Sequence, residues 1–208
     1  MAQVTSEAEQ VAAVPVGINA TPLGLFAFAL TLFVLSFINA GFIVPKAGAG
    51  LAIILGLAFF YGGLVLLLVG MLEFRGGNNF TGTVFASYSA FWLSFGFLVL
   101  PGTGMLAALL KEGTFAPALG LYLLAWTIFT VLILVCVLRT NMALIAIFVF
   151  LLLTLIALTI GTMSGAAFFN VLGGYLGIIT ALLAWYLGLA GLLPYVNPGL
   201  SLPVGPRS

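Results

Sequence analysis

Histidine and aspartate are both absent from the 208 residues, and the acidic side chains are confined to Glu7, Glu9, Glu73 and Glu112. Metal sites usually draw on His, Cys and carboxylate ligands, and Cys136 lies alone in an apolar run. We therefore expect no metal site and no cofactor. The lack of a clustered nucleophile and base also predicts that the protein is not an enzyme.

Charge of either sign is scarce. Charged residues make up 4% of the chain and hydrophobic residues 64%, with a mean hydropathy of +1.37, whereas soluble domains carry about 25% charged residues. The net charge is +1 without a basic cluster, so a nucleic-acid partner is not expected. A soluble domain of this length cannot hide so much apolar surface, and the composition predicts a protein embedded in a lipid bilayer.

Six long apolar runs without a charged residue account for most of the chain. A helix needs about 20 residues to cross the hydrocarbon core, and runs without period-two alternation exclude a β-barrel. We therefore predict an all-α integral membrane protein with six transmembrane helices per protomer. The predicted spans are residues 22–44, 51–72, 83–100, 115–138, 142–160 and 168–193.

The remaining segments are short. We expect a polar N-terminal tail at residues 1–18, a six-helix transport domain at 19–194 and a C-terminal tail at 195–208. The first tail holds no Lys or Arg, unlike the positive start of a secretory signal, so it is expected to stay in place.

Basic residues predict the orientation. Six crossings place both termini on one side, together with Arg75, Arg139 and Arg207, whereas Lys46 and Lys111 fall on the other. The positive-inside rule then favours cytoplasmic termini in the cell membrane.

Glycine is abundant, with 26 residues, and several are spaced to let helices approach closely, as in Gly161-x-x-x-Gly165 and Gly173-x-x-x-Gly177. Small residues support helix packing in lipid. The pattern fits packing within one bundle and packing between subunits equally well.

Polar residues mark the starts of two predicted spans. Asn19, Thr21 and Pro22 open the first span, and Asn78 precedes the third. Both starts fall on the same side of the membrane, so their free backbone N–H groups are expected to point toward a shared spot that attracts a carboxylate. The alternative is ordinary helix capping at the membrane surface.

Hydroxyl side chains are spaced along the third span. Thr83, Ser87 and Ser94 lie four and seven residues apart, which places them on one helical face beside Tyr88. A row of weak donors suits a path on which an anion is never held tightly. The alternative is that each hydroxyl bonds the carbonyl of the preceding turn.

Glu73 and Arg75 follow the second span and are the charged pair nearest to it. Pairing at the membrane interface is the simpler interpretation. The functional alternative makes Glu73 a proton acceptor for coupled transport, since ionisable groups near membrane sites often relay protons.

Consecutive stretches of the chain resemble motifs of the acetate uptake transporter family, also called the succinate/acetate permease family. Residues 19–25, Asn-Ala-Thr-Pro-Leu-Gly-Leu, are similar to its Asn-Pro-Ala-Pro-Leu-Gly-Leu signature, and Ala20 stands where the signature has its first proline. Further resemblances follow in the family's order, at residues 39–41, 60–63, 70–74, 77–80 and 85–92. The resemblance covers about residues 19–190.

The resemblance implies a hexamer in which each protomer has its own path for acetate and related short carboxylates, succinate among the candidates. Phe28 and Tyr88 match positions that narrow this path, and Leu151 is the third by its spacing back from Gly161. Three such side chains arranged around the path would act as an apolar gate.

The other polar positions that the resemblance covers complete the expected site. Asn19, Asn39 and Asn78 are expected to contact the solute or shape its entry. Glu73 lies in residues 70–74, one of the stretches that resemble the family's motifs. The predicted function is proton-coupled carboxylate transport, with a passive small-anion channel as the alternative.

Overall fold

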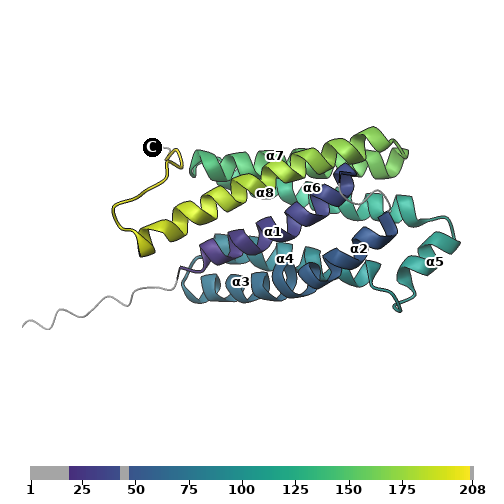
Figure 1. The fold of residues 1–208 in the computed structure, drawn as a ribbon, viewed down its shortest axis with the longest axis horizontal. Coiled ribbons are helices and arrows are strands. Elements are labelled where there is room, and N and C mark those ends of the chain that lie inside the picture. Colours follow the sequence, from purple (N-terminus) through teal and green to yellow (C-terminus); the bar gives the residue numbers. More distant parts are fainter. Residues whose placement is uncertain (1–18, 43–46, 207–208) are drawn as a thin grey trace, which may run out of the picture.

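The computed structural model describes residues 19–42 and 47–206, so the expected N-terminal tail, Lys46 and Arg207 lie outside the described residues. This part of the chain is helical and contains no strand (Figure 1). Its elements are α1 (Thr21–Ala40), α2 (Ala47–Gly56), the π-helical segment η1 (Leu57–Val65), α3 (Leu66–Arg75), α4 (Asn79–Val99), α5 (Met105–Lys111), α6 (Phe115–Val137), α7 (Met142–Ser164) and α8 (Ala167–Val196).

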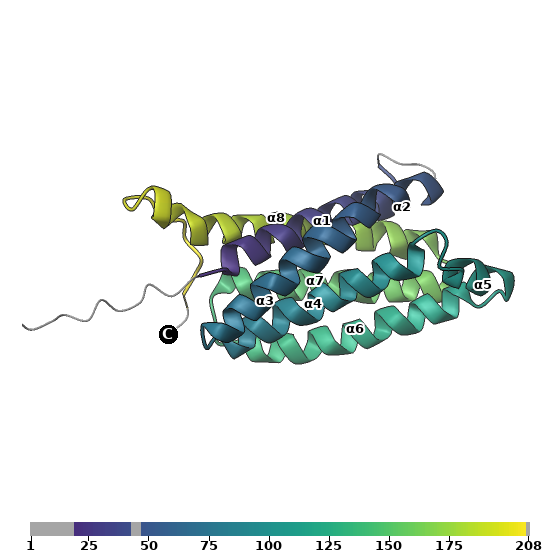
Figure 2. The same cartoon turned by 90° about the horizontal axis from the view of Figure 1, so that it is seen from below.

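Within the described residues, six helices are long and apolar enough to cross a membrane. They run alongside one another as a bundle (Figures 1 and 2). The all-α fold with six transmembrane helices is thereby confirmed. The spans are Thr21–Ala40, Ala52–Arg75, Asn79–Val99, Phe115–Val137, Met142–Ser164 and Ala167–Val196.

Several span limits differ from those predicted. The third span begins at Asn79 rather than at Thr83, because Asn78 caps it by accepting a hydrogen bond from Thr81 N at 3.2 Å. The second span runs on to Arg75, so Glu73 lies inside a helix that was expected to end before it. The short helix α5, between the third and fourth spans, was not predicted.

Glycine brings α8 against α1. A β-carbon on Gly174 would lie 2.7 Å from Ala40 Cα and 2.8 Å from the Ser36 carbonyl oxygen. Gly177 faces the Ser36 side chain, and Gly161 faces Asn170 on α8. These glycines therefore serve packing within the chain, where only a residue without a side chain permits such a close approach.

The middle of the second span winds as a π-helix over residues 57–65. Gly62 lies in this segment, and a β-carbon there would meet Thr31 of α1 and Trp92 of α4 at 2.8 Å. The Gly63 carbonyl accepts a hydrogen bond from Ser89 Oγ at 2.9 Å, which ties η1 to α4. Wide turns of this kind are rare and cluster at functional sites.

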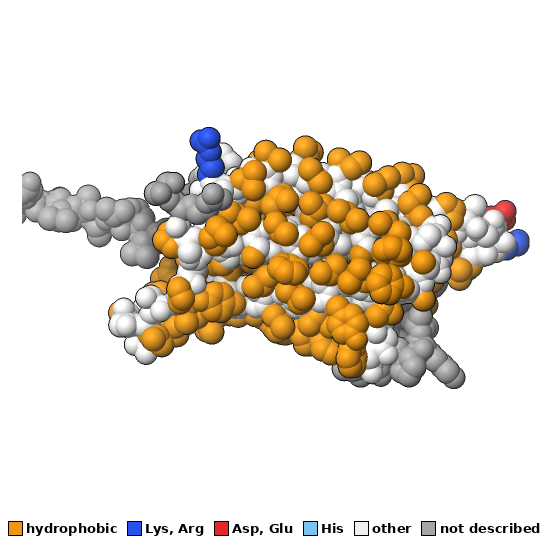
Figure 3. Space-filling view, turned by 90° about the horizontal axis from the view of Figure 1, so that it is seen from above, with side chains coloured by type: hydrophobic (Ala, Val, Ile, Leu, Met, Phe, Trp, Pro, Cys, Tyr) orange, Lys and Arg blue, Asp and Glu red, His pale blue; other side chains and the backbone are white. Residues whose placement is uncertain are grey.

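The outer surface is largely apolar. Figure 3 shows hydrophobic side chains across the middle of the visible face, with Lys, Arg and acidic side chains only at the two ends. Leu132 and Val135 of α6 are among the exposed apolar residues, at 62% and 64%. Such a surface suits contact with lipid.

Candidate functional site

Two cavities lie inside the bundle, with volumes of about 350 Å³ and 490 Å³. The smaller lies between the starts of α1, α4 and α7, on the side of the membrane to which α8 returns, and we call it the terminal-side cavity. The larger reaches the opposite ends of α1, α4 and α7, and we call it the far cavity. Spans one, three and five therefore line both cavities.

Three side chains line both cavities: Phe28, Tyr88 and Leu151. They are 7%, 4% and 4% exposed. They follow the first residues of α1, α4 and α7 by seven, nine and nine residues, which corresponds to similar depths of about 11–14 Å at 1.5 Å per residue. The same three side chains therefore separate the two cavities at one level of the bundle.

Hydrogen bonds and ring contacts hold Tyr88 in position. Its hydroxyl lies 2.8 Å from Thr130 Oγ1. Thr130 uses its only hydroxyl proton on the Trp126 carbonyl at 2.7 Å, so Tyr88 is the donor of the shared bond. The Phe28 ring meets Tyr88 edge-on, with ring centroids 5.8 Å apart. Contacts from α1 and α6 therefore hold the Tyr88 ring between the two cavities.

The terminal-side cavity has a polar rim. Asn19, Thr21 and Pro22 line it as the chain enters α1, and Asn141 and Ser201 line it from the start of α7 and from the C-terminal segment. Asn19 accepts a hydrogen bond from Thr21 N at 3.2 Å. The first-span residues singled out in the sequence are thus brought to one cavity mouth.

Glu73 is held between the start of α1 and the cap of α4. Its two carboxylate oxygens accept hydrogen bonds of 2.9 Å from Thr21 Oγ1 and from Asn78 Nδ2. The Glu73 side chain is 5% exposed. The starts of α1 and α4 thus share a cavity, and the carboxylate between Thr21 and Asn78 is the protein's own, held by side-chain donors and not by free backbone N–H groups.

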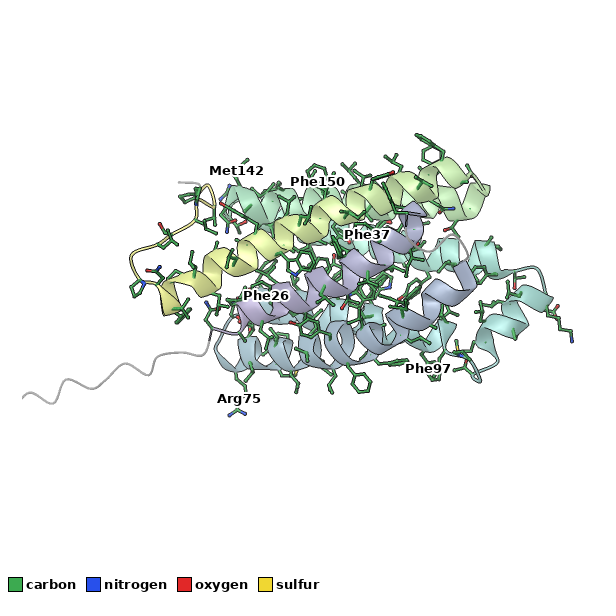
Figure 4. All side chains as sticks on the ribbon, in the orientation of Figure 1. Phe26, Phe37, Arg75, Phe97, Met142 and Phe150 are labelled. Atoms are coloured by element: carbon green, nitrogen blue, oxygen red, sulfur yellow. The ribbon has the colours of Figure 1, made fainter. Side chains whose placement is uncertain are left out.

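The same geometry changes two further interpretations. Thr21 donates its hydroxyl to Glu73 and does not cap α1, whose cap residue Ala20 makes no side-chain bond. Asn78 caps α4 and clamps Glu73 but does not line either cavity. Arg75, at the end of the same helix, points away from the bundle (Figure 4). Glu73 therefore does not form the expected interfacial pair with Arg75. It is buried and accepts hydrogen bonds from Thr21 and Asn78 instead.

The expected hydroxyl stripe on the third span does not face either cavity. Thr83, Ser87 and Ser94 are missing from the lining of both cavities. Thr83 donates to the Asn79 carbonyl at 2.8 Å and Ser94 to the Ala90 carbonyl at 2.7 Å. These two side chains are exposed and Ser87 is half-buried. Thr83 and Ser94 therefore follow the alternative interpretation, in which each hydroxyl donates to a carbonyl of the preceding helical turn.

The far cavity combines apolar walls with a few polar groups. Asn39 lines it from the end of α1, and Thr162 and Asn170 line it from α7 and α8. Trp92 also lines this cavity and is 1% exposed, and its Nε1 has no hydrogen-bond partner within the described part of the chain. A buried N–H without an acceptor costs stability.

Sequence reasoning missed Asn141, Trp92 and Ser201. Asn141 precedes a predicted span in the same way as Asn78, and its side chain accepts from Leu144 N at 2.8 Å, so the capping pattern was available to find it. Nothing in the sequence set Trp92 apart from the other two tryptophans. No charged residue appears in the lining of either cavity among the described residues, nor is there a group of three potential metal ligands in that part.

Comparison with known proteins gives the family. Residues 3–206 match the GPR1/FUN34/yaaH family. The chain belongs to this family. A solved structure of the bacterial acetate channel SatP superposes with a TM-score of 0.77 at 31% sequence identity, covering 90% of this chain and 99% of that one. The resemblance inferred from the sequence motifs is thereby confirmed.

Curated members of the family include three informative relatives. Ammonia transport outward protein 2 of Saccharomyces cerevisiae is 42% identical over 183 residues, covering 86% of this chain and 63% of that protein. Acetate permease A of Emericella nidulans is 40% identical over 197 residues, covering 89% and 65%. The succinate-acetate/proton symporter SatP of Escherichia coli is 32% identical over 188 residues, covering 90% and 95%. The chain thus spans less than two thirds of these fungal relatives.

Proposed function

We propose that this GPR1/FUN34/yaaH protein carries acetate and related short carboxylates across a membrane, with succinate as a further candidate. The observation that carries the proposal is the pair of cavities that share Phe28, Tyr88 and Leu151. We assign these three side chains the role of an apolar constriction between two water-accessible cavities. The names of the acetate permease and SatP relatives support the choice of substrate.

The chemistry of the linings suits a weakly held carboxylate. Asn19 and Asn141 offer amides at one mouth, and Asn39 and Asn170 offer them at the other. Neutral donors bind a carboxylate without the strong attraction of Lys or Arg, so the solute is released readily.

We further propose that transport is coupled to protons. Burying an ionised carboxylate in an apolar setting costs far more than burying a neutral polar group, and the constriction residues Phe28 and Leu151 offer no counter-charge. Glu73 is a buried carboxylate bonded to Thr21, which itself lines the terminal-side cavity. A proton held on Glu73 could therefore be passed to a solute at that mouth.

A passive anion channel is the second candidate, and one observation favours it. Glu73 does not itself line either cavity, since Thr21 and Asn78 enclose its two oxygens. A similar protein of solved structure is described as an acetate channel, whereas the Escherichia coli relative is described as a proton symporter. Coupling is the property that separates the two candidates.

Uptake by reconstituted vesicles tests the proposal. Labelled acetate is followed with and without an inward proton gradient, and protein-free vesicles report the leak of neutral acetic acid. Accumulation above the external concentration supports the coupled transporter, and equilibration alone supports the channel. Flux no greater than in protein-free vesicles contradicts the proposed function.

We also propose a hexamer of such protomers in the cell membrane, each with its own route and with both termini in the cytoplasm. The largely apolar outer surface supports lipid and subunit contact alike (Figure 3). Arg75 and Arg139 on the terminal side, against Lys111 on the far side, support the orientation.

A further inference from the structure

The segment after α8 covers the terminal-side cavity. Residues 200–205, which we call the strap, follow a turn in which Leu200 N donates to the Asn197 carbonyl at 3.0 Å. Ser201, Leu202 and Val204 contribute to the lining of the cavity. Figure 4 shows Met142, the first residue of α7, beside this C-terminal segment. A segment expected to be a simple tail therefore forms a wall of the proposed route.

The strap docks on the start of α7 through backbone hydrogen bonds. Met142 N donates to the Gly205 carbonyl at 2.8 Å, and Ala143 N donates to the Val204 carbonyl at 3.1 Å. The first N–H groups of a helix have no partner inside the helix. The next two in α7 are satisfied by Asn141, through its side chain and its carbonyl. The strap therefore completes the cap of α7.

A side-chain bond adds a third attachment. Tyr186 of α8 donates its hydroxyl to the Pro203 carbonyl at 2.7 Å. Gly205 has a φ of +65°, a conformation that favours glycine, and a β-carbon on it would lie 2.8 Å from Met142 Cβ. The last contact of the strap therefore depends on the absence of a side chain at residue 205.

Little of the strap is buried. Leu202, Val204 and Gly205 are half-buried, whereas Ser201 and Pro203 are exposed. Leu200 is 48% exposed. Segments held by a few hydrogen bonds and little apolar burial open at low free energy. The strap thus has a defined position, but little free energy is needed to release it.

We propose that the strap is a lid on the terminal-side cavity, and that its release from α7 admits the carboxylate to the route. This inference rests on the proposed transport function, and it assigns the regulation of access to residues 200–205. Because Ser201 and Val204 line the cavity that also contains Asn19 and Asn141, movement of the strap changes the mouth and leaves the constriction in place.

Variants that loosen the strap test the lid. Tyr186→Phe removes the bond to Pro203, and Gly205→Ala introduces the close contact with Met142. Matched controls are Tyr195→Phe on the same helix, where the ring is 61% exposed, and Gly199→Ala, where a β-carbon meets nothing within 4 Å. Loss of one hydrogen bond should raise the open population by about two- to tenfold.

Access to the cavity is measured without relying on transport. Ala190 lines the cavity and is half-buried, so Ala190→Cys in a Cys136→Ser background reports how fast a membrane-impermeant thiol reagent enters. Both loosening variants should speed labelling by about two- to tenfold, and both controls should label like the unmodified background. Equal labelling rates in all five proteins would overturn the lid.

Cross-linking the strap to α7 should hold the lid closed and so lower transport. Ala143→Cys and Val204→Cys, whose backbones are hydrogen-bonded, are joined by a short cleavable thiol cross-linker in the same background. Acetate flux should fall several-fold when the link is made and recover when it is cleaved. Unchanged flux in the linked protein contradicts the lid. If no variant transports acetate, the proposed function fails, while the labelling rates still decide whether the strap covers the cavity.

Discussion

The Tyr88 side chain is held by a hydrogen bond and by ring contacts on several sides. It donates to Thr130, whose own proton is engaged by the Trp126 carbonyl. The Tyr88 ring also contacts Phe129 and Phe148, at centroid distances of 5.7 Å and 6.4 Å. A side chain fixed on several sides presents an unchanging edge to the constriction.

Replacing Thr130 should therefore be more harmful than replacing Tyr88. Thr130→Val leaves the buried Tyr88 hydroxyl without its acceptor, at a cost of about 0.5–2 kcal/mol of stability. Tyr88→Phe costs less, because Thr130 keeps its bond to Trp126. Thermal unfolding in detergent measures both, and the double variant should recover most of the stability lost by Thr130→Val. Additive losses would show that the bond does not hold the ring.

The carboxylate of Glu73 carries the proposed coupling. Glu73→Gln removes the carboxylate but keeps the side-chain shape. Proton-driven accumulation of acetate should be lost, while equilibration down a gradient remains. Glu112→Gln, an exposed glutamate after α5, is the matched control and should behave like the native protein. Full accumulation by Glu73→Gln in vesicles would remove Glu73 from the coupling.

The positions and partners of single side chains were the features hardest to predict from the sequence. The sequence could not show whether Thr83 and Ser94 face a cavity. Because α4 is apolar on most sides, spacing alone does not say which of its faces packs against neighbouring helices. Glu73 was placed outside the second span because charge usually ends a membrane helix, whereas Thr21 and Asn78 make its burial possible. Phe28 and Tyr88 came from the family resemblance and not from periodicity.

At the scale of helices, the apolar runs were sufficient for most of the architecture. A bilayer demands long apolar helices, so the existence and order of the spans followed from hydrophobicity, whereas limits such as the start at Asn79 depend on caps. The π-helical turn of η1 was not predictable, because it depends on how Gly62 packs against Thr31 and Trp92. The strap was missed because its bonds to α7 join segments far apart in the sequence.

Helix packing at Gly174 offers a direct test at this scale. Gly174→Ala places a β-carbon against the α1 backbone at Ala40, which cannot move aside as a flexible side chain can. Overpacking of this kind costs about 1–3 kcal/mol, and the midpoint of thermal unfolding in detergent should fall. Gly56→Ala is the control, since a β-carbon there meets nothing within 4 Å. Equal midpoints for the two variants would contradict the assigned α1–α8 contact.

At the scale of the whole molecule, the outer apolar surface must face lipid or other subunits. Composition alone predicted a membrane protein, but it could not say which apolar faces meet another chain. The hexamer is our proposal, and native mass spectrometry of the protein released from mild detergent should give a mass near six copies of the 21.7 kDa chain. A monomer that stays stable under the same conditions would refute it.

The most direct test of the proposed route is to change the size of a side chain that lines both cavities. Leu151 lines both cavities, whereas Leu153 of the same helix is 43% exposed on the outer surface. In proteoliposomes, Leu151→Trp should abolish acetate flux and Leu151→Ala should admit bulkier monocarboxylates, while Leu153→Trp and Leu153→Ala leave flux unchanged. Native flux through correctly folded Leu151→Trp would show that the solute does not pass between Phe28, Tyr88 and Leu151.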